Sequence, residues 1–169
     1  VLDFEKVEGI TAVESNPPNF GGKTVLTVDL LLFLFFNTTT KTNKAEEIFN
    51  RFRNKDKVVV KGEIQIDGED YIIVREVNRK LKRNKTDYTV STSLEFFKKL
   101  SDGSLQNFTG EQRRETEEFI KKSIGTMDDF LMTILTTSTN LEELIDSKPT
   151  ARGQVLSRFL GLDSLKLKE

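Results

Sequence analysis

The chain contains no cysteine and no histidine in its 169 residues. Without cysteine it forms no disulfide bond and offers no thiolate ligand to a metal ion. Without histidine it lacks the commonest metal ligand and the side chain that most often serves as a general base near neutral pH. Its chemistry must therefore rest on carboxylate, hydroxyl, lysine, arginine and backbone groups.

The chain also has almost no net charge and only short apolar runs. The formal net charge is −1, which gives the whole chain no electrostatic attraction to nucleic acid. The longest apolar run, residues 25–36, includes Asp29 and is too short to cross a bilayer. No signal peptide is visible. We therefore expect a protein without membrane contact, located in the cytoplasm or associated with the nucleoid.

A glycine-containing turn followed directly by the apolar run is the strongest feature that is present. Gly21-Gly22-Lys23-Thr24 leads into residues 25–36, and residues 10–14 predict a short strand upstream. Strand, glycine loop and helix in this order suit a phosphate, because glycines let backbone N–H groups converge on the anion at a helix start. The lysine reaches the β- and γ-phosphates, and the Thr24 hydroxyl holds Mg²⁺. The predicted ATP-binding residues are Asn19, Phe20, Gly21, Gly22, Lys23, Thr24 and Val25.

The loop departs from the standard phosphate-binding pattern, in which a glycine precedes Gly22 by five positions. Pro17 occupies that position, and Pro18 follows it. Each proline fixes φ and removes a backbone donor. Phe20 stands where related loops carry a further glycine. The alternative interpretation is a glycine-rich turn that caps a core helix and binds no nucleotide.

Periodicity along the rest of the chain predicts a mixed α/β domain with an antiparallel meander. Asp67-Gly68 is a hairpin turn signal between two of the expected strands, because both residues tolerate positive φ. The expected strands are residues 1–5, 10–14, 58–66, 71–77 and 88–92. The expected helices are residues 25–36, 45–52, 111–127 and a last helix from Pro149, with 129–135 either helix or buried strand and a polar break at 136–140.

Three stretches resemble the N-terminal lobe of the SMC/RecF/SbcC-type ATPases, an ABC-like family of DNA-repair and chromosome proteins. The first is residues 9–13 leading to Asn19 and residues 21–24, and the second is the hairpin around residues 67–68. The third is residues 148–152 with Leu156 and residues 160–163, which is similar to the family's K-P-x-x-R…L-G-L-D helix. The likeness is nearest to the SbcC-type subunit of the double-strand-break nuclease complex.

This resemblance implies an α/β P-loop lobe over residues 1–169 that binds ATP and Mg²⁺. It also implies a C-terminal ATPase lobe, a second head that joins in an ATP-dependent homodimer, DNA, and a nuclease subunit as partners. The family's Q-loop falls between residues 135 and 140, where Ser138 takes the place of the glutamine as a candidate Mg²⁺ ligand.

The motifs that the family needs for hydrolysis are not found in the sequence. Mg²⁺ and the attacking water require an acidic pair after an apolar strand. The apolar runs that end in aspartate, residues 26–29 and 144–146, are not followed by glutamate, and residues 100–106 suit a Ser/Asp/Gly turn better than a signature motif. We therefore expect half of an ATPase head that has no turnover alone. The alternative hypothesis is a nucleotide-binding lobe that has lost hydrolysis and has a structural or regulatory role.

A basic stretch follows the second hairpin strand. It contains Arg75, Arg79, Lys80, Lys82, Arg83 and Lys85 with one acid, Glu76. This density of cations suits DNA phosphates, and we take residues 79, 80, 82, 83 and 85 as the candidate DNA contacts. No aromatic residue is interleaved with them, so base stacking is not expected. The alternative for this stretch is a hairpin whose charges are simply solvated. The alternative for the whole chain is a module that binds DNA or protein without a nucleotide.

Overall fold

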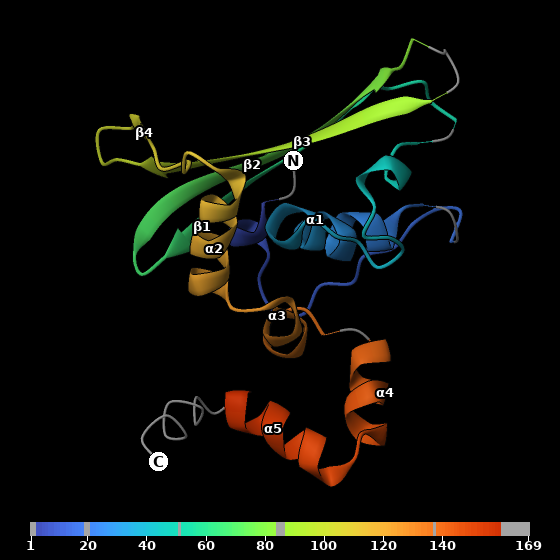
Figure 1. The fold of residues 1–169 in the computed structure, drawn as a ribbon. Coiled ribbons are helices and arrows are strands. Elements are labelled where there is room, and N and C mark those ends of the chain that lie inside the picture. The colour runs from blue at the N-terminus through green and yellow to red at the C-terminus, as the bar shows by residue number, and fades with distance from the viewer. Residues whose placement is uncertain (1–2, 19–20, 51, 84–86, 137, 160–169) are drawn as a thin grey trace.

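The structure is a computed structural model of a mixed α/β protein, and the mixed α/β prediction is confirmed (Figure 1). It describes all residues except 1–2, 19–20, 51, 84–86, 137 and 160–169. Four strands form one antiparallel sheet in the order β1-β2-β3-β4. Their bounds are Lys57–Ile66, Glu69–Leu81, Tyr88–Lys99 and Leu105–Asn107.

The first hairpin confirms the predicted turn. Ile66 pairs with Glu69, so Asp67 and Gly68 alone form the connection, and both have positive φ, 52° and 80°. Two residues of positive φ match the twist of the flanking strands. β2 and β3 are longer than the 71–77 and 88–92 predicted. Strand pairing continues through polar residues at their ends, such as Asn78, Arg79 and Lys80, which pair with Ser91, Val90 and Thr89.

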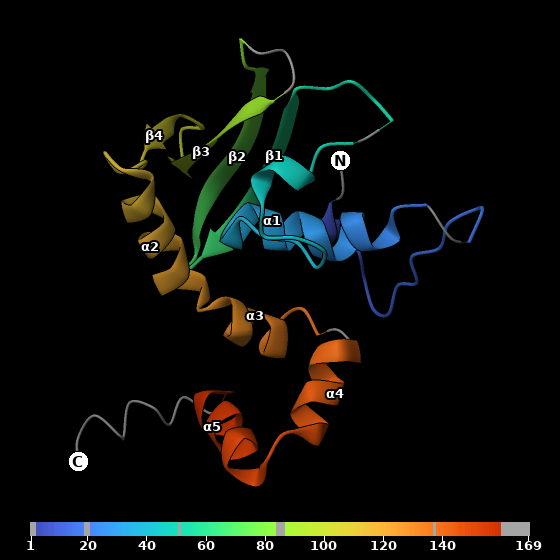
Figure 2. The ribbon, with the colours of Figure 1, turned by 45° about the vertical axis from the view of Figure 1, so that its right-hand side comes forward.

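The apolar run is helical, as predicted. It begins with a π-helical turn, η2 (Val25–Asp29), continues as α1 (Leu30–Phe36), and ends at Asn37 in the left-handed conformation. α1 packs on one face of the sheet, and α2 (Arg113–Ile124) lies on the same face beside it (Figure 2). Leu34 sits over Gly62 of β1, where a Cβ would overlap the leucine side chain. The glycine thus permits close helix–sheet packing.

The main core lies between the sheet and these helices. It is formed by the buried side chains of Leu32, Leu34, Phe35, Ile73, Leu94, Phe96, Ile120, Phe130 and Leu131. Three helices follow α2: α3 (Met127–Thr133), α4 (Ser138–Asp146) and α5 (Pro149–Phe159). Capping boxes at Gln112 and Thr126 start α2 and α3. In the described part of the chain, no helix is both long and apolar enough to cross a membrane.

Several predicted elements are wrong. Residues 10–14 form no strand, and no strand among the described residues lies beside them to supply backbone partners. Described residues 4–6 are a 3₁₀ helix, η1 (Phe4–Lys6), in place of the strand expected at 1–5. The helix expected at 45–52 is the single turn η3 (Ala45–Glu47). Residues 129–133 are helical as part of α3, and residues 134–135 form a turn after it. The polar break is short because α4 begins at Ser138. Pro149 does begin the last helix, as predicted.

Candidate phosphate-binding loop

The predicted loop closes on itself ahead of the helix that it starts. Gly21 passes so close to Ser15 that a Cβ at position 21 would overlap the serine side chain. Gly22 has a φ of 73°, a conformation that only glycine adopts without strain. Both glycines are therefore required by the local backbone, one for close approach and one for the turn.

Lys23 points back across the loop. Its Nζ lies 3.0 Å from Ser15 Oγ and also donates to the carbonyl oxygen of Pro18. Ser15 Oγ lies 2.9 Å from the Pro17 carbonyl oxygen and 3.1 Å from that of Pro18, and its one proton goes to one of them at a time. The ammonium group is thus surrounded by loop oxygen atoms on the inner side of the turn.

The helix start leaves backbone donors available beside this lysine. The first helical hydrogen bond runs from Leu26 N–H to the Gly22 carbonyl, 3.0 Å. The N–H groups of Lys23, Thr24 and Val25 come before it and so have no partner within the helix. They lie at the positive end of the helix dipole. The side chains of Thr24 and Val25 are exposed, and the Thr24 hydroxyl makes no capping bond.

The structure brings together only part of the predicted nucleotide and metal site. Residues 21–25 share the loop and helix start, whereas Asn19 and Phe20 lie outside the described residues. Ser138 begins α4, and Figures 1 and 2 both show the start of α4 well away from the loop. The described residues contain no group of three or more acidic side chains placed to hold a metal ion.

Asp29, the acidic residue near the helix start, has a structural contact. Its side chain is buried, and Oδ1 accepts from the Thr40 N–H at 2.7 Å and from Thr40 Oγ1 at 2.8 Å. The carboxylate therefore fastens the polar loop after α1 to the η2 turn. It lies inside the protein rather than beside the exposed Thr24 hydroxyl.

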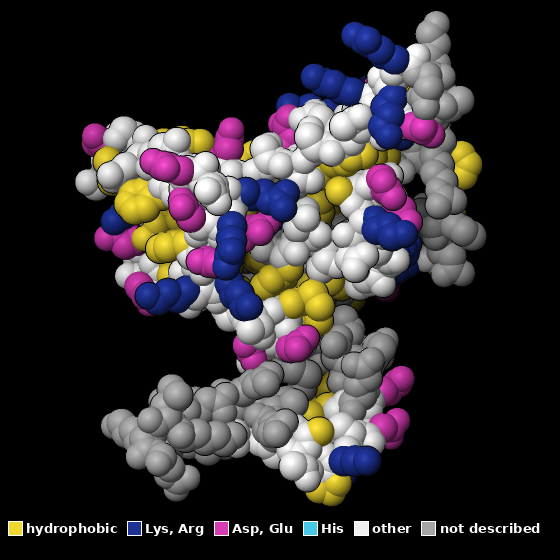
Figure 3. Space-filling view, in the orientation of Figure 1, with side chains coloured by type: hydrophobic (Ala, Val, Ile, Leu, Met, Phe, Trp, Pro, Cys, Tyr) yellow, Lys and Arg dark blue, Asp and Glu magenta, His cyan; other side chains and the backbone are white. Residues whose placement is uncertain are grey.

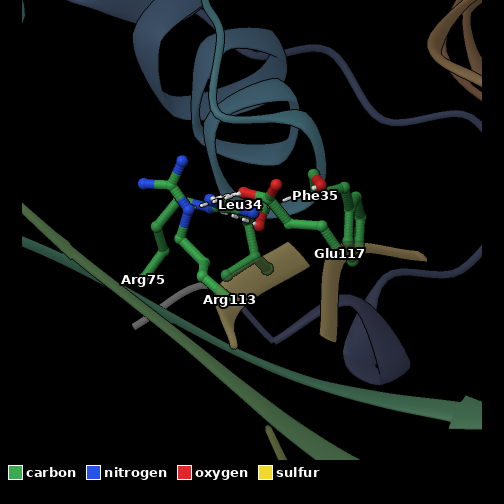
Figure 4. Close-up of polar contacts among 5 residues, drawn as sticks. All are labelled: Leu34, Phe35, Arg75, Arg113 and Glu117. Carbon is green, nitrogen blue, oxygen red and sulfur yellow. Dashed lines mark hydrogen bonds and ion pairs between the residues drawn. The ribbon is translucent and has the colours of Figure 1, made fainter. Parts of the chain in front are cut away.

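Side chains along β2 point alternately to the two faces of the sheet, so the cations of the predicted basic stretch do not all lie on one surface. Arg75 faces the core and is fully buried, so the prediction that it joins an exposed basic stretch is wrong. Its guanidinium donates from Nε to the Leu34 carbonyl at 3.0 Å, from Nη2 to the Phe35 carbonyl at 3.4 Å, and from Nη1 to Glu117 Oε1 at 3.2 Å (Figure 4). Burial lowers the pKa of Arg75, and the Glu117 carboxylate partly opposes this.

Arg79 also has contacts within the protein. Its Nε lies 2.9 Å from Asp56 Oδ1, and its guanidinium sits between the rings of Phe49 and Tyr88 at 4.8 and 4.7 Å from their centroids. Lys80, Lys82 and Arg83 are exposed, and Figure 3 shows Lys and Arg side chains gathered at this end of the sheet. Lys85 lies outside the described residues.

Sequence reasoning missed Ser15 and the two aromatic partners of Arg79. Ser15 lies in a segment predicted only to lead into the loop, and a serine before two prolines carries no pattern of its own. Phe49 and Tyr88 come from segments about 30 and 10 residues away in sequence. The β2–β3 register brings Tyr88 to the arginine, and Phe49 reaches it from the segment between η3 and β1. Neither placement is visible in local periodicity.

Comparison with known proteins adds no relative. No protein-family model matches the chain, and no curated protein matches it significantly. The functional argument therefore depends on the residues of this chain and their arrangement.

Proposed function

We propose that this chain is the ATP–Mg²⁺-binding N-terminal lobe of an SMC/SbcC-like ATPase head with a P-loop fold. The observation that carries the proposal is the position of Lys23. Its ammonium group contacts oxygen atoms of a two-glycine turn, and the turn leads directly into a helix whose first N–H groups have no partner within the helix. Cation, amides and helix dipole all favour an anion at the same point.

Binding would exchange the present partners of Lys23 for phosphate oxygens. The neutral oxygens of Ser15 and Pro18 hold the ammonium group weakly compared with an anionic phosphate, because charge-assisted hydrogen bonds are about twice as strong. The exposed Thr24 hydroxyl is free to join the shell of a Mg²⁺ ion on the same phosphates. The π-helical turn at Val25–Asp29 is consistent with a functional site, where such turns are frequent.

Within a complete head, this lobe would work with a C-terminal ATPase lobe and a second head. ATP would hold the two heads closed, and closure would be coupled to DNA and to a nuclease subunit. DNA phosphates would meet Lys80, Lys82 and Arg83, with Lys85 beside them in sequence and Arg79 contributing through its partly exposed guanidinium. The proposed location is the cytoplasm or the nucleoid.

The test is calorimetric titration of the parent chain and Lys23→Ala with ATP–Mg²⁺. The parent should bind weakly, because Pro17 withdraws a donor and a second lobe is absent, and Lys23→Ala should abolish the binding. Lys41→Ala, which removes an exposed lysine on the loop after α1, is the matched control and should bind like the parent. Equal binding by the Lys23 variant and the parent would remove the loop from consideration.

A structural role for the loop is the second candidate, and the contacts of Lys23 favour it specifically. If the ammonium group serves only to tie Ser15 to Pro18, Lys23→Ala will lower the free energy of unfolding and the parent will give no heat with ATP–Mg²⁺. Unfolding in urea, measured on the same two proteins, separates this outcome from nucleotide binding.

A further inference from the structure

The end of the sheet at the β2–β3 hairpin contains a hollow bordered by polar and aromatic side chains. β1 begins at Lys57, which pairs with Asn78, so residues 79–81 of β2 and 88–90 of β3 extend beyond it. Beside this open edge lies a hollow of about 580 Å³, with Asn54, Asn78, Lys80 and Tyr88 among its lining residues. A hollow of this size accommodates a base and its sugar.

Tyr88 contributes an aromatic ring to the lining of this hollow. The Arg79 guanidinium lies over its ring and also contacts Asp56 and the Phe49 ring. These contacts restrict the orientation of the tyrosine ring. The side chain nevertheless remains 42% exposed. A rigid, exposed ring stacks on a planar ligand at little entropic cost.

Lys80 lines the hollow, and other exposed cations are close in sequence to its lining residues. Lys80, Lys82 and Arg83 come from the hairpin, and Arg53 and Lys55 come from the segment that leads into β1. None of these five forms an ion pair with another described residue. Of the nearby acids, Asp56 pairs with Arg79, Glu76 pairs with Lys57, and Asp87 lies at the end of the hairpin. Positive charge is therefore concentrated here although the whole chain has a net charge of −1.

We propose that this end of the sheet binds single-stranded DNA, with one unpaired base stacked on Tyr88 and the flanking phosphates on the cations. Aromatic stacking within a basic groove is the usual mode of single-strand binding, and a duplex hides its base faces from such a ring. The amides of Asn54 and Asn78 line the hollow, where Asn54 Oδ1 accepts from Arg79 Nη2 at 3.4 Å and Asn78 Nδ2 donates to Glu76 at 2.6 Å. A base edge would meet the remaining amide groups.

This surface shares no residue with the Lys23 loop, so it goes beyond the nucleotide site. Only the choice of DNA over RNA rests on the proposed function, because the ring and the cations require an unpaired strand of either kind. Tighter binding of oligouridylate than of oligothymidylate would overturn that choice.

Tyrosine fluorescence provides a direct measurement. The chain has two tyrosines and no tryptophan, so Tyr71→Phe leaves Tyr88 as the only strong emitter. The substitution keeps the ring that stacks on Phe96 in the core. Titration of this protein with an oligothymidylate of about 20 nucleotides should quench the emission saturably, because the stacked base contacts the reporting ring.

Ring variants test the stacking step with a labelled oligothymidylate. Tyr88→Leu should weaken binding roughly 5- to 100-fold, the range expected when one base–aromatic stack is lost, and Tyr88→Phe should bind like the parent. Phe108→Leu, which removes a 43%-exposed ring at the opposite end of the sheet, is the matched control and should change nothing.

Charge reversal tests the phosphate contacts. Lys80, Lys82 and Arg83 changed together to glutamate should weaken binding and flatten the slope of log affinity against log salt by about two, since each single-strand phosphate contributes about 0.7. The matched control reverses Lys99, Lys121 and Lys122, three exposed lysines away from the hairpin. It makes the same change in net charge and should leave affinity and slope unchanged.

Two results would overturn the proposal. One is an absence of oligothymidylate binding by the folded parent. The other is equal affinity for a duplex of the same length together with no effect of Tyr88→Leu, which would show a phosphate surface without stacking. Lys23→Ala should retain single-strand binding, so a failure of the nucleotide site is distinguishable from a failure of this one.

Discussion

Arg75 links the end of α1 to the sheet. Its guanidinium donates hydrogen bonds to two carbonyl oxygens in the last turn of α1 and to one carboxylate oxygen of Glu117 on α2. The carbonyls at a helix end have no partner within the helix, and a cation there is also favoured by the helix dipole. One side chain of the sheet therefore supplies donors to carbonyls at the end of the helix that starts at the candidate phosphate-binding loop.

We expect Arg75→Met to destabilise the fold by about 2–6 kcal/mol, because it leaves the Leu34 and Phe35 carbonyls without their donor, and each buried group left unpaired costs about 1–3 kcal/mol. Arg113→Met is the control, since Arg113 contacts the same Glu117 oxygen at 3.3 Å from a side chain that is 47% exposed. An exposed pair of this kind contributes at most about 1 kcal/mol. Urea unfolding of both variants gives the comparison, and equal losses would show that the buried contacts carry no special weight.

At the scale of elements, the contact of α1 with β1 depends on one strand glycine. Gly62 lies beneath Leu34, whose side chain is 1% exposed and so has no free space to move into. A methyl group at position 62 forces the leucine or the helix to shift, and packed cores resist such shifts.

Gly62→Ala should therefore cost about 1–3 kcal/mol, the usual range for overpacking. In a Leu34→Ala background the same change should cost much less, because the overlapping atoms are gone. Gly153→Ala on α5 is the control: its Cβ meets nothing, so a helix propensity gain of about 0.5–1 kcal/mol is expected. A double-mutant cycle in urea measures the coupling, and strictly additive costs would contradict this account of the packing.

The elements also show what local sequence can and cannot predict. The Asp67-Gly68 turn, the strands beside it and the helix after Thr24 follow from periodicity and turn chemistry, which act over a few residues. Residues 10–14 have side chains typical of a strand, but they form none because no strand among the described residues lies beside them to supply backbone hydrogen bonds. The ring of Tyr88 reaches Arg79 only through the β2–β3 register, which local sequence does not specify.

At the scale of the whole molecule, nucleotide binding and hydrolysis have separate requirements. Binding needs converging donors and a cation, and in the proposed function the helix start and Lys23 would supply them. Hydrolysis also needs carboxylates that hold Mg²⁺ and orient water. The Asp29 carboxylate already accepts two hydrogen bonds from Thr40. Among the residues that the structure describes, no cluster of acidic side chains is placed to hold a metal ion.

We therefore expect the purified chain to release no phosphate from ATP–Mg²⁺ above the buffer background, under conditions in which calorimetry detects binding. Phosphate release over time, in the parent and in Lys23→Ala, is the measurement. Turnover by the parent that disappears in the Lys23 variant would show that this chain has a catalytic carboxylate pair of its own. Equal turnover in both proteins would instead indicate a contaminating ATPase, because the change removes the cation that contacts the loop oxygens.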